Sequence, residues 1–442
     1  MPTSYRPYSP DQGLLLPSSL SEWLPEDHLA YFISDAVEAM DLGAFYARYE
    51  GDGRRRQPFE PRMMVKVLIY GYASGIFSSR KLARRLTEDV AFRVLSANNF
   101  PAHRTIREFR QLHLKEFSEL FVQVVRLARE AGLVSLGRVG VDGTKIKANA
   151  SKHKAMSYAR MQEEEARLRR EIAGLLKQAE AQDAADEDRY GPDDHNGGLP
   201  QELKRREDRL KVIEQAKARI EERQRQADKA DARTVDEDGV TRGMTGRRCL
   251  RAYGVPQPDA QDNFTDPDSR IMPTSGGGFE QCYNAQAAVD EGSHLIVAAQ
   301  LINSSSEYAI LLPMVDQVEC NTGSEPQMIL ADTNYASEAG FKGLEERGTA
   351  ACVALGSEDK QRAIRSDLPA TRRMVQWLRT PEGRAHYRRR KTIPEPVFGW
   401  IKQVLGFRSF SLRGMTAVSA EWRLICMAMN LKRLHRLGWT PG

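Results

Sequence analysis

The feature that most constrains the fold of this chain is the charge-dense segment 152–232, which lies between two stretches of strand-like sequence. It holds two long runs of Glu, Arg, Lys, Gln and Ala, and the turn-forming sequence DEDRYGPDDHNGGLP separates them. This pattern predicts two long antiparallel helices joined by a loop. Charged helix faces of this kind are usually solvated, and a role of the two helices as an arm for DNA or for a partner stays open.

Short apolar segments on both sides of this insertion have the composition of β-strands. The segment before the insertion is GRVGVDGTKIK, residues 137–147. The segments after it are the strand-like runs 279–290, 294–302, 327–335 and 349–355 and the helical runs 308–318 and 337–346. Residues 233–278, rich in Gly, Pro, Asp and Arg, are expected to form a loop. This order predicts a mixed α/β sheet in one catalytic domain that the helical pair interrupts.

The first 135 residues are expected to be mostly helical, because apolar residues recur at helical spacing in segments such as PEDHLAYFISDAVEAM. Pro61 suits the first turn of one helix, and Ser78 or Ser79 suits the cap of the next. The segment 105–108 has the form of a capping box that opens a further helix. Short helices beside basic residues are compatible with a helix-turn-helix reader of DNA, and an ordinary helical bundle is the alternative.

The composition argues against several classes of protein. Hydrophobic residues make up 41% of the 442 residues and charged residues 28%, which supports a packed core under a polar surface. The most apolar stretch, residues 63–77, is too short to span a bilayer, and no secretion signal is expected. The five cysteines show no CxxC spacing, so neither a disulfide framework nor a zinc site is expected. These features favour a cytoplasmic protein.

The net charge of +5 conceals an uneven distribution of charge along the chain. Residues 360–442 contain 18 Lys and Arg against 4 Asp and Glu, and residues 53–86 contain nine Lys and Arg against one Glu. Two basic zones indicate a polyanionic partner that contacts both, with merely solvated surfaces as the alternative. The candidate DNA-binding residues of the second zone are Arg80, Lys81, Arg84 and Arg85.

Three carboxylates are candidates for chemistry. Asp142 and Asp332 each end an apolar strand-like segment, which exposes a carboxylate at a sheet edge while the backbone is held rigid. Glu395 lies in IPEPVFGWIK, at the expected start of a helix and close to the basic run 388–391. Two divalent cations about 3.5–4 Å apart, held by such oxygens, can activate the attacking oxygen and stabilise the leaving oxygen in phosphoryl transfer. As alternatives, strand-end aspartates also begin turns, and the helix dipole favours an acid in a first turn.

Nearly the whole chain resembles the DDE transposases of bacterial insertion sequences. YRPYSPDQGLLLPSSLSEWLPEDHLAYFI and PRMMVKVLIYGYASGIFSSRKLARRL resemble the helical N-terminal domain of that family. GRVGVDGTKIKANASKHKAMSY resembles its first-aspartate segment, and FTDPDSRIMPTSGGGFEQCYNAQAAVD resembles the segment that leads into the next strands. ADTNYAS resembles the second-aspartate motif, with Asn334 where the family usually has glycine, and IPEPVFGWIK resembles the glutamate motif.

The resemblance implies an RNase H-like fold in which Asp142, Asp332 and Glu395 are the catalytic residues and the metal ligands. It implies two Mg²⁺ or Mn²⁺ ions as cofactors. The implied reaction is hydrolysis at the end of the element, followed by attack of the freed 3′-hydroxyl on target DNA. The implied partners are double-stranded DNA, both terminal inverted repeats and target, and a second copy of the chain in the synaptic complex.

The family also carries a Tyr-Arg-Glu-Lys signature around the glutamate, to which Tyr387, Arg390, Glu395 and Lys402 correspond. In the family three residues separate the Arg from the Glu, whereas four residues separate Arg390 from Glu395. Lys391 occupies the strict position instead. Which of these two bases contacts phosphate therefore stays open, and Lys402 is expected to contact the DNA backbone.

The resemblance and the element order together give an expected organisation of the chain. The expected parts are a helical DNA-binding domain, 1–135; an RNase H-like catalytic domain, 136–151 and 233–410; an inserted helical hairpin, 152–232; and a C-terminal basic helix, 411–442. Such a protein is expected at the nucleoid in the bacterial cytoplasm.

Three other functions are alternatives. A domesticated or inactive DNA-binding protein would keep the basic surfaces and lose a carboxylate, but all three carboxylates are present. A metal-dependent nuclease that cuts without joining would share the same three acids. A structural coiled-coil protein would explain residues 152–232 but not the aspartates at the ends of strands.

Overall fold

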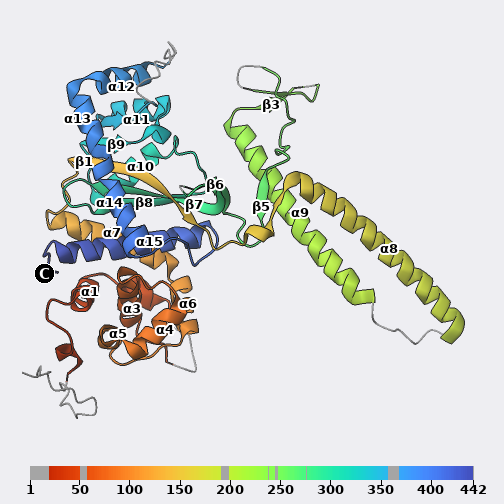
Figure 1. The fold of residues 1–442 in the computed structure, drawn as a ribbon, viewed down its shortest axis with the longest axis horizontal. Helices are drawn as coiled ribbons and strands as arrows, with labels where there is room; N and C mark the ends of the chain where they lie inside the picture. The colour runs from red at the N-terminus through yellow and green to blue at the C-terminus, as the bar shows by residue number, and fades with distance from the viewer. Residues whose placement is uncertain are drawn as a thin grey trace, which may run out of the picture.

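The computed structural model describes residues 19–49, 57–190, 199–236, 238–243, 247–274, 276–356 and 368–441. A mixed sheet with helices packed against it lies at the centre of the molecule. The N-terminal helices lie on one side of this core, and two long helices extend away from it (Figure 1). In the described part of the chain, every helix is too short or too polar to cross a lipid bilayer.

The N-terminal part is helical, as the sequence predicts. It consists of η1 (Leu20–Glu22), α1 (Leu29–Glu38), α2 (Gly43–Ala47), α3 (Pro61–Ala73), α4 (Ser79–Glu88), α5 (Val90–Leu95), α6 (His103–Leu112) and α7 (Leu114–Glu130). Almost every residue of α3 is buried, so α3 is the central helix of this part. Pro61 occupies its first turn, and the Glu60 side chain accepts a hydrogen bond from the Met63 backbone N–H at 2.7 Å.

Two details of the predicted helix starts are wrong. α6 begins at His103, so Thr105 lies inside the helix and does not cap it. The helix starts earlier because Ala102, which follows Pro101, already has the extended backbone of a cap residue. Ser78 precedes α4 with an extended backbone, but its side chain makes no capping hydrogen bond.

The central sheet has the strand order β10-β9-β1-β7-β6, and β8 also pairs with β7. Its strands are β1 (Arg138–Lys147), β6 (Arg270–Pro273), β7 (Phe279–Asp290), β8 (Ile296–Ile302), β9 (Met328–Ala331) and β10 (Ala350–Val353). β1 pairs antiparallel with β7 and parallel with β9, and β9 pairs parallel with β10. This is a mixed sheet as expected of an RNase H-like core, and all five predicted strands are confirmed.

The remaining helices follow the strands in sequence. They are α10 (Leu311–Thr322), α11 (Glu338–Arg347), α12 (Pro369–Arg379), α13 (Pro381–Arg389), η4 (Arg390–Thr392), α14 (Pro394–Gly399), the π-helical turn η5 (Trp400–Val404) and α15 (Met415–Arg436). α10 packs against β8, and α14 packs against β1 and β7. Because η5 has π-helical geometry, residues after Gly399 do not continue the helical face that the spacing of Glu395 and Lys402 suggested.

The last helix joins the N-terminal part to the sheet. α15 contacts α3 and α7 as well as β8, and its residues from Val418 to Leu431 are almost all buried. A buried polar network strengthens this junction: Arg110 donates to the Tyr72 hydroxyl at 2.7 Å, and Tyr72 donates to the Glu421 carboxylate at 3.1 Å. The predicted C-terminal helix is therefore present, but it is a core helix along most of its length.

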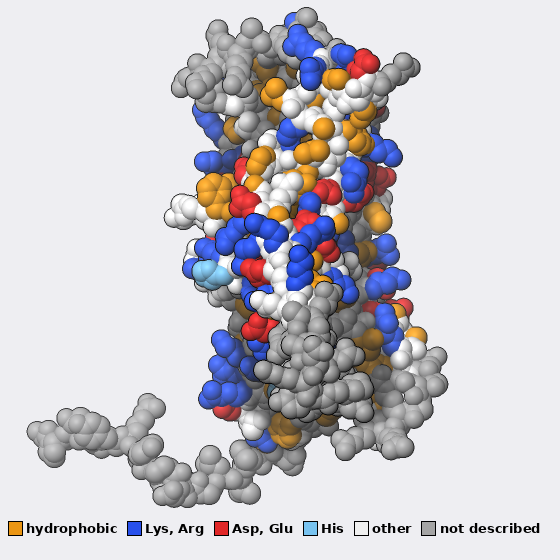
Figure 2. All heavy atoms as spheres, turned by 90° about the vertical axis from the view of Figure 1, so that its right-hand side faces the viewer, with side chains coloured by type: hydrophobic (Ala, Val, Ile, Leu, Met, Phe, Trp, Pro, Cys, Tyr) orange, Lys and Arg blue, Asp and Glu red, His pale blue; other side chains and the backbone are white. Residues whose placement is uncertain are grey.

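The two predicted long helices of the insertion are confirmed as α8 (Tyr158–Tyr190) and α9 (Leu199–Ala230). They form a separate small hydrophobic cluster that includes Leu168, Ile213 and Ile220. At its base, Arg219 and Arg223 bind the buried Asp262 carboxylate, with N–O distances of 2.5 and 2.8 Å. Lys, Arg, Asp and Glu side chains are interspersed over the face of this arm (Figure 2), as expected of a solvated surface.

The expectation that residues 233–278 form only a loop is wrong. This segment contributes β3 (Thr234–Val235), β4 (Thr241–Arg242), β5 (Gln261–Asn263) and the sheet strand β6. β5 pairs with β2 (Ala155–Ser157), which precedes α8. Strands of two to four residues carry too little periodicity to be recognised among Gly, Pro and Asp, so sequence patterns miss them.

We expect the arm to be dispensable for folding of the core. None of the residues of the large hydrophobic core comes from the arm. The Phe264 N–H donates to the Lys154 carbonyl at 2.9 Å, so a short Gly-Ser linker can join these two positions in place of residues 155–263. The shortened protein should unfold in one cooperative transition, measured by circular dichroism during heating. A broad, non-cooperative transition would contradict this expectation.

Candidate active site

Asp142 lies near the middle of β1, the strand that is paired on both edges in its first half. Gly140, on the same face of the strand, lies against Ile393 and Pro394 at the start of α14, where a Cβ atom would approach both side chains to about 3 Å. On the opposite face, a Cβ atom at Gly143 would clash with Gln286 and Glu307 at less than 3.0 Å. The two glycines thus allow close packing on both faces of the strand that carries Asp142.

The side chain of Asp142 is half-buried. One of its oxygens accepts a hydrogen bond from the Gly143 N–H at 2.8 Å. Burial is the main cause that raises the pKa of Asp142 to about 6. The negative charges of Asp332 and Glu307 act in the same direction, whereas the Gly143 N–H and the Arg390 guanidinium oppose them. Asp332 and Arg390 thus lie near enough to Asp142 for their charges to influence its pKa.

Asp332 lies directly after β9 and caps the short helix η3 (Thr333–Tyr335). Its carboxylate accepts hydrogen bonds from the Asn334 backbone N–H at 2.8 Å and from the Asn334 side-chain amide at 3.3 Å. The asparagine that stands in place of the family's glycine thus orients this carboxylate through two donors. Since β9 lies beside β1 in the sheet, the two aspartates belong to the same region of the sheet.

Of the two candidate bases before Glu395, Arg390 is the one that lies near the aspartates. Its charge acts on Asp142 and on the buried hydroxyl of Tyr335, and its guanidinium lies 5.7 Å from the centre of the Tyr387 ring. Lys391 is exposed. The 3₁₀ turn η4 contains both residues, and it separates their side chains despite their adjacency in the sequence.

The predicted DNA-contacting lysine is held close to β1. Lys402 lies in the π-helical turn η5 and donates a hydrogen bond from Nζ to the Lys145 carbonyl at 3.1 Å. Partial burial lowers the pKa of its ammonium group, and the charge of Asp142 opposes that effect. Lys402 is thus a cation on the Asp142 side of the sheet.

Glu395 is the predicted residue that the structure does not bring into the cluster. It lies in the first turn of α14 and is exposed, and its charge is not among the main influences on the pKa of Asp142. Its neighbour Pro394 nevertheless contacts Gly140, two residues before Asp142 in the strand. Glu395 therefore belongs to the element that covers the Asp142 face of β1.

Sequence reasoning missed Glu307, which lies between β8 and α10. This carboxylate is buried, and it accepts hydrogen bonds from the side-chain amides of Asn284 at 2.6 Å and Gln286 at 3.2 Å. Tyr335 donates its hydroxyl hydrogen bond to Gln286. An acid in the polar segment NSSSEY carries no distinctive spacing, so only the folded chain shows that Glu307 lies behind Gly143.

The donor chemistry of Asp142 and Asp332 fits a divalent cation. Both offer carboxylate oxygens at fixed strand positions, and their mutual repulsion favours a cation between them. Among the described residues, however, no three His, Cys, Asp or Glu side chains converge closely enough to hold one metal ion. The site in this structure is thus a pair of aspartates with Arg390 close by.

The predicted DNA-binding residues of the N-terminal part lie together on α4. Arg80, Lys81, Arg84 and Arg85 are all exposed, whereas Leu82 and Leu86 face the core. Arg84 pairs with Glu88 at 2.7 Å, and Arg85 pairs with Asp89 at 3.8 Å. This leaves Arg80 and Lys81 as the two cations of the helix for which no acidic partner is found among the described residues.

We predict that Asp142→Asn stabilises the metal-free protein at pH 8. A pKa that rises from 3.8 to about 6 on folding means that the ionised carboxylate destabilises the folded state by about 3 kcal/mol above pH 6. The variant should gain about this free energy of unfolding in urea with EDTA, and the gain should vanish below about pH 3, where the carboxyl is protonated in both states. The exposed Asp259→Asn is the control. An equal effect at both pH values would contradict the assignment.

Comparisons with protein families give two matches. Residues 255–431 match the family described as Transposase DDE domain, and residues 18–112 match the family described as Transposase domain (DUF772). Searches of curated proteins and of solved structures found no match. The first match includes Asp332 and Glu395 and begins after Asp142. The two matches together cover more than half of the chain, which therefore belongs to the DDE transposases, enzymes of phosphoryl transfer.

Proposed function

We propose that this transposase binds the terminal inverted repeats of its element, cleaves the DNA at their ends and joins the freed ends to target DNA. The observation that supports this most directly is the position of Asp142 on β1 and of Asp332 directly after the neighbouring strand β9, where the charges of Asp332 and Arg390 act on Asp142. A catalytic site for phosphoryl transfer requires carboxylates that hold divalent cations and bases that hold phosphates. This region of the sheet offers both.

In this proposal Asp142, Asp332 and Glu395 hold Mg²⁺ or Mn²⁺. When bound, the metal ions supply Lewis-acid stabilisation of the attacking and leaving oxygens. Asn334 keeps the Asp332 carboxylate oriented, and Gly143 does the same for Asp142. Glu395 would have to approach the aspartates when the metal and DNA bind, a movement of the α14 segment.

The bases have separate roles in the proposal. Arg390, beside Asp142, is placed to contact the phosphate that reacts, and Tyr387 supports its guanidinium. Lys402 contacts the DNA backbone on the same side of the sheet, and exposed Lys391 contributes charge. The α4 surface binds DNA farther from the reaction. Two copies of the chain, each on one DNA end, complete the proposed synaptic complex.

We expect that Asp142→Asn, Asp332→Asn and Glu395→Gln each reduce cleavage of DNA that carries the terminal repeats. The loss should exceed about a hundredfold, because even groups that only support metal ligands account for about 10–100-fold. Binding of the same DNA in EDTA should be largely retained. The assay measures Mg²⁺-dependent end cleavage and joining on a gel.

Glu346→Gln is the control, because Glu346 is an exposed carboxylate of α11, and Glu382→Gln tests the next candidate for the third acid. Full cleavage by Glu395→Gln would remove Glu395 from the proposed triad. Cleavage without joining by the unchanged protein would favour a nuclease. DNA binding without any cleavage would favour a domesticated or inactive protein.

The N-terminal surface generates a separate prediction. Replacing Arg80 and Lys81 by alanine should weaken binding to duplex DNA. The negative slope of log K against log [NaCl] should become shallower by up to about 2, because each lost phosphate contact removes about 0.9 from its magnitude. Fluorescence anisotropy over a range of NaCl concentrations measures this slope. Replacing Lys115 and Arg126, exposed on α7, is the control. Equal slopes for the two double variants would contradict a DNA-binding role of α4.

A further inference from the structure

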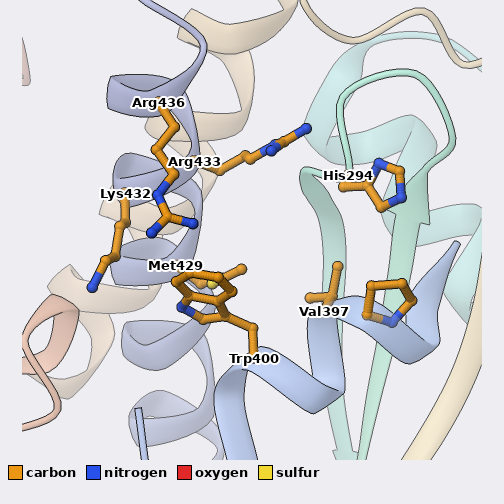
Figure 3. Close-up of a pocket in the computed structure, with 8 residues that line it drawn as sticks. His294, Val397, Trp400, Met429, Lys432, Arg433 and Arg436 are labelled. Carbon is orange, nitrogen blue, oxygen red and sulfur yellow. The ribbon is translucent and has the colours of Figure 1, made fainter. Parts of the chain in front are cut away.

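A cationic pocket of about 310 Å³ lies between α14 and the end of α15 (Figure 3). Val397 and Trp400 line it from the α14 side, and Lys432, Arg433 and Arg436 line it from the α15 side. Its wall thus combines an apolar surface with three cations from one turn of a helix. No Asp or Glu is among the residues that line it.

Backbone carbonyls hold two cations of the pocket in place, but no negative charge neutralises them among the residues that line the pocket. Lys432 donates to the Ala73 carbonyl at 2.8 Å, and Arg433 donates to the Ser293 carbonyl at 2.8 Å. These carbonyls orient the side chains without supplying a negative charge. Arg436 is exposed, and no ion pair or hydrogen bond of its side chain is found in the described part of the chain.

Two of these cations lie over the aromatic ring of Trp400. The Arg436 guanidinium lies 4.0 Å from the centre of the ring, and Lys432 Nζ lies 5.9 Å from it. After partial burial, the charge of Arg436 further lowers the pKa of Lys432, so the two cations repel each other. An anion between them would relieve this repulsion, and the fixed aromatic ring already holds both cations in place for it.

The pocket lies next to the proposed catalytic glutamate. Pro396 and Val397, which line it, directly follow Glu395 in α14, and one turn of an α-helix rises only 5.4 Å. A DNA strand whose reacting phosphate lies at Glu395 therefore has further phosphates within reach of the pocket.

We propose that this pocket binds a backbone phosphate of the DNA strand next to the cleavage site. Arg436 and Lys432 bind the phosphate oxygens, and the apolar wall of Val397 and Trp400 lies against the adjoining sugar. The inference rests on the proposed function, because Glu395 marks the cleavage site in it. The same phosphate chemistry would suit a free phosphate or nucleotide, which the test separates from DNA.

The test compares Arg436→Gln with Arg379→Gln. Arg379 is an exposed arginine of α12, far from the pocket, so both variants lose one positive charge (Figure 1). Binding of a fluorescent DNA duplex is measured in EDTA over a range of NaCl concentrations. Arg436→Gln should reduce the slope of log K against log [NaCl] by about 0.9 and weaken binding about fivefold at 150 mM NaCl. Arg436→Lys should retain most of the slope.

Three outcomes would overturn the proposal. Equal slopes for Arg436→Gln and Arg379→Gln would show that the pocket contacts no phosphate of DNA. Inorganic phosphate or ATP could raise the unfolding temperature of the unchanged protein but not that of Arg436→Gln, while both proteins bind DNA equally well. This result would assign the pocket to a free ligand. Arg436→Gln could also bind DNA more weakly only because it is less stable, which a lower unfolding temperature would show. If Arg436→Lys lost stability and DNA binding to the same extent, Arg436 would have a structural role.

These outcomes are distinguishable from a failure of the proposed function. If the unchanged protein binds no duplex DNA, the proposed function itself fails. If it binds DNA and only the variant comparison is negative, the pocket alone fails. Since the measurement uses EDTA, neither result depends on the catalytic triad.

Discussion

The pairing of β1 with β7 on one edge and with β9 on the other positions the two aspartates of the candidate site. The antiparallel pairing runs along nearly the whole strand, whereas the parallel pairing ends at Gly140. Beyond Gly140 the edge of β1 is free of β9, and Asp142 lies in this part. Asp332 reaches the same region because it follows β9 directly. Packing of Pro394 on Gly140 then sets the position of α14 over the same face.

The site illustrates how a function can conflict with stability. A fold optimised only for stability would not bury Asp142 near two other carboxylates, because burial and repulsion both disfavour its charge. Glu307 increases this conflict, since its hydrogen-bond donors are neutral amides. A divalent cation reverses the sign of these interactions, so the folded protein and its cofactor would stabilise each other. The same reasoning applies to the cations around Trp400, for which an anion has the corresponding effect.

Much of this arrangement could be predicted from the sequence, and the failures have physical causes. The strand before Asp332 was predictable, because its apolar run ends directly at that aspartate. The expected strand end at Asp142 was wrong, because pairing with β7 continues β1 to Lys147 and leaves Asp142 near the middle of the strand. The choice between Arg390 and Lys391 was not, because it depends on the 3₁₀ turn η4. Glu307 was missed because its proximity to Gly143 depends on tertiary packing. The assignments of the catalytic triad and of the domain boundaries stay predictions.

The position of α15 has a consequence for how the protein is made. During translation, α15 leaves the ribosome after every strand and helix that it contacts, yet it packs against α3, α7 and β8 at the same time. The nascent chain must therefore hold apolar surfaces of both parts without their common partner. A prematurely terminated chain would retain the basic α4 surface but lack this partner, and it would be prone to aggregation. Full packing of the N-terminal helices against the sheet therefore has to wait for the synthesis of α15.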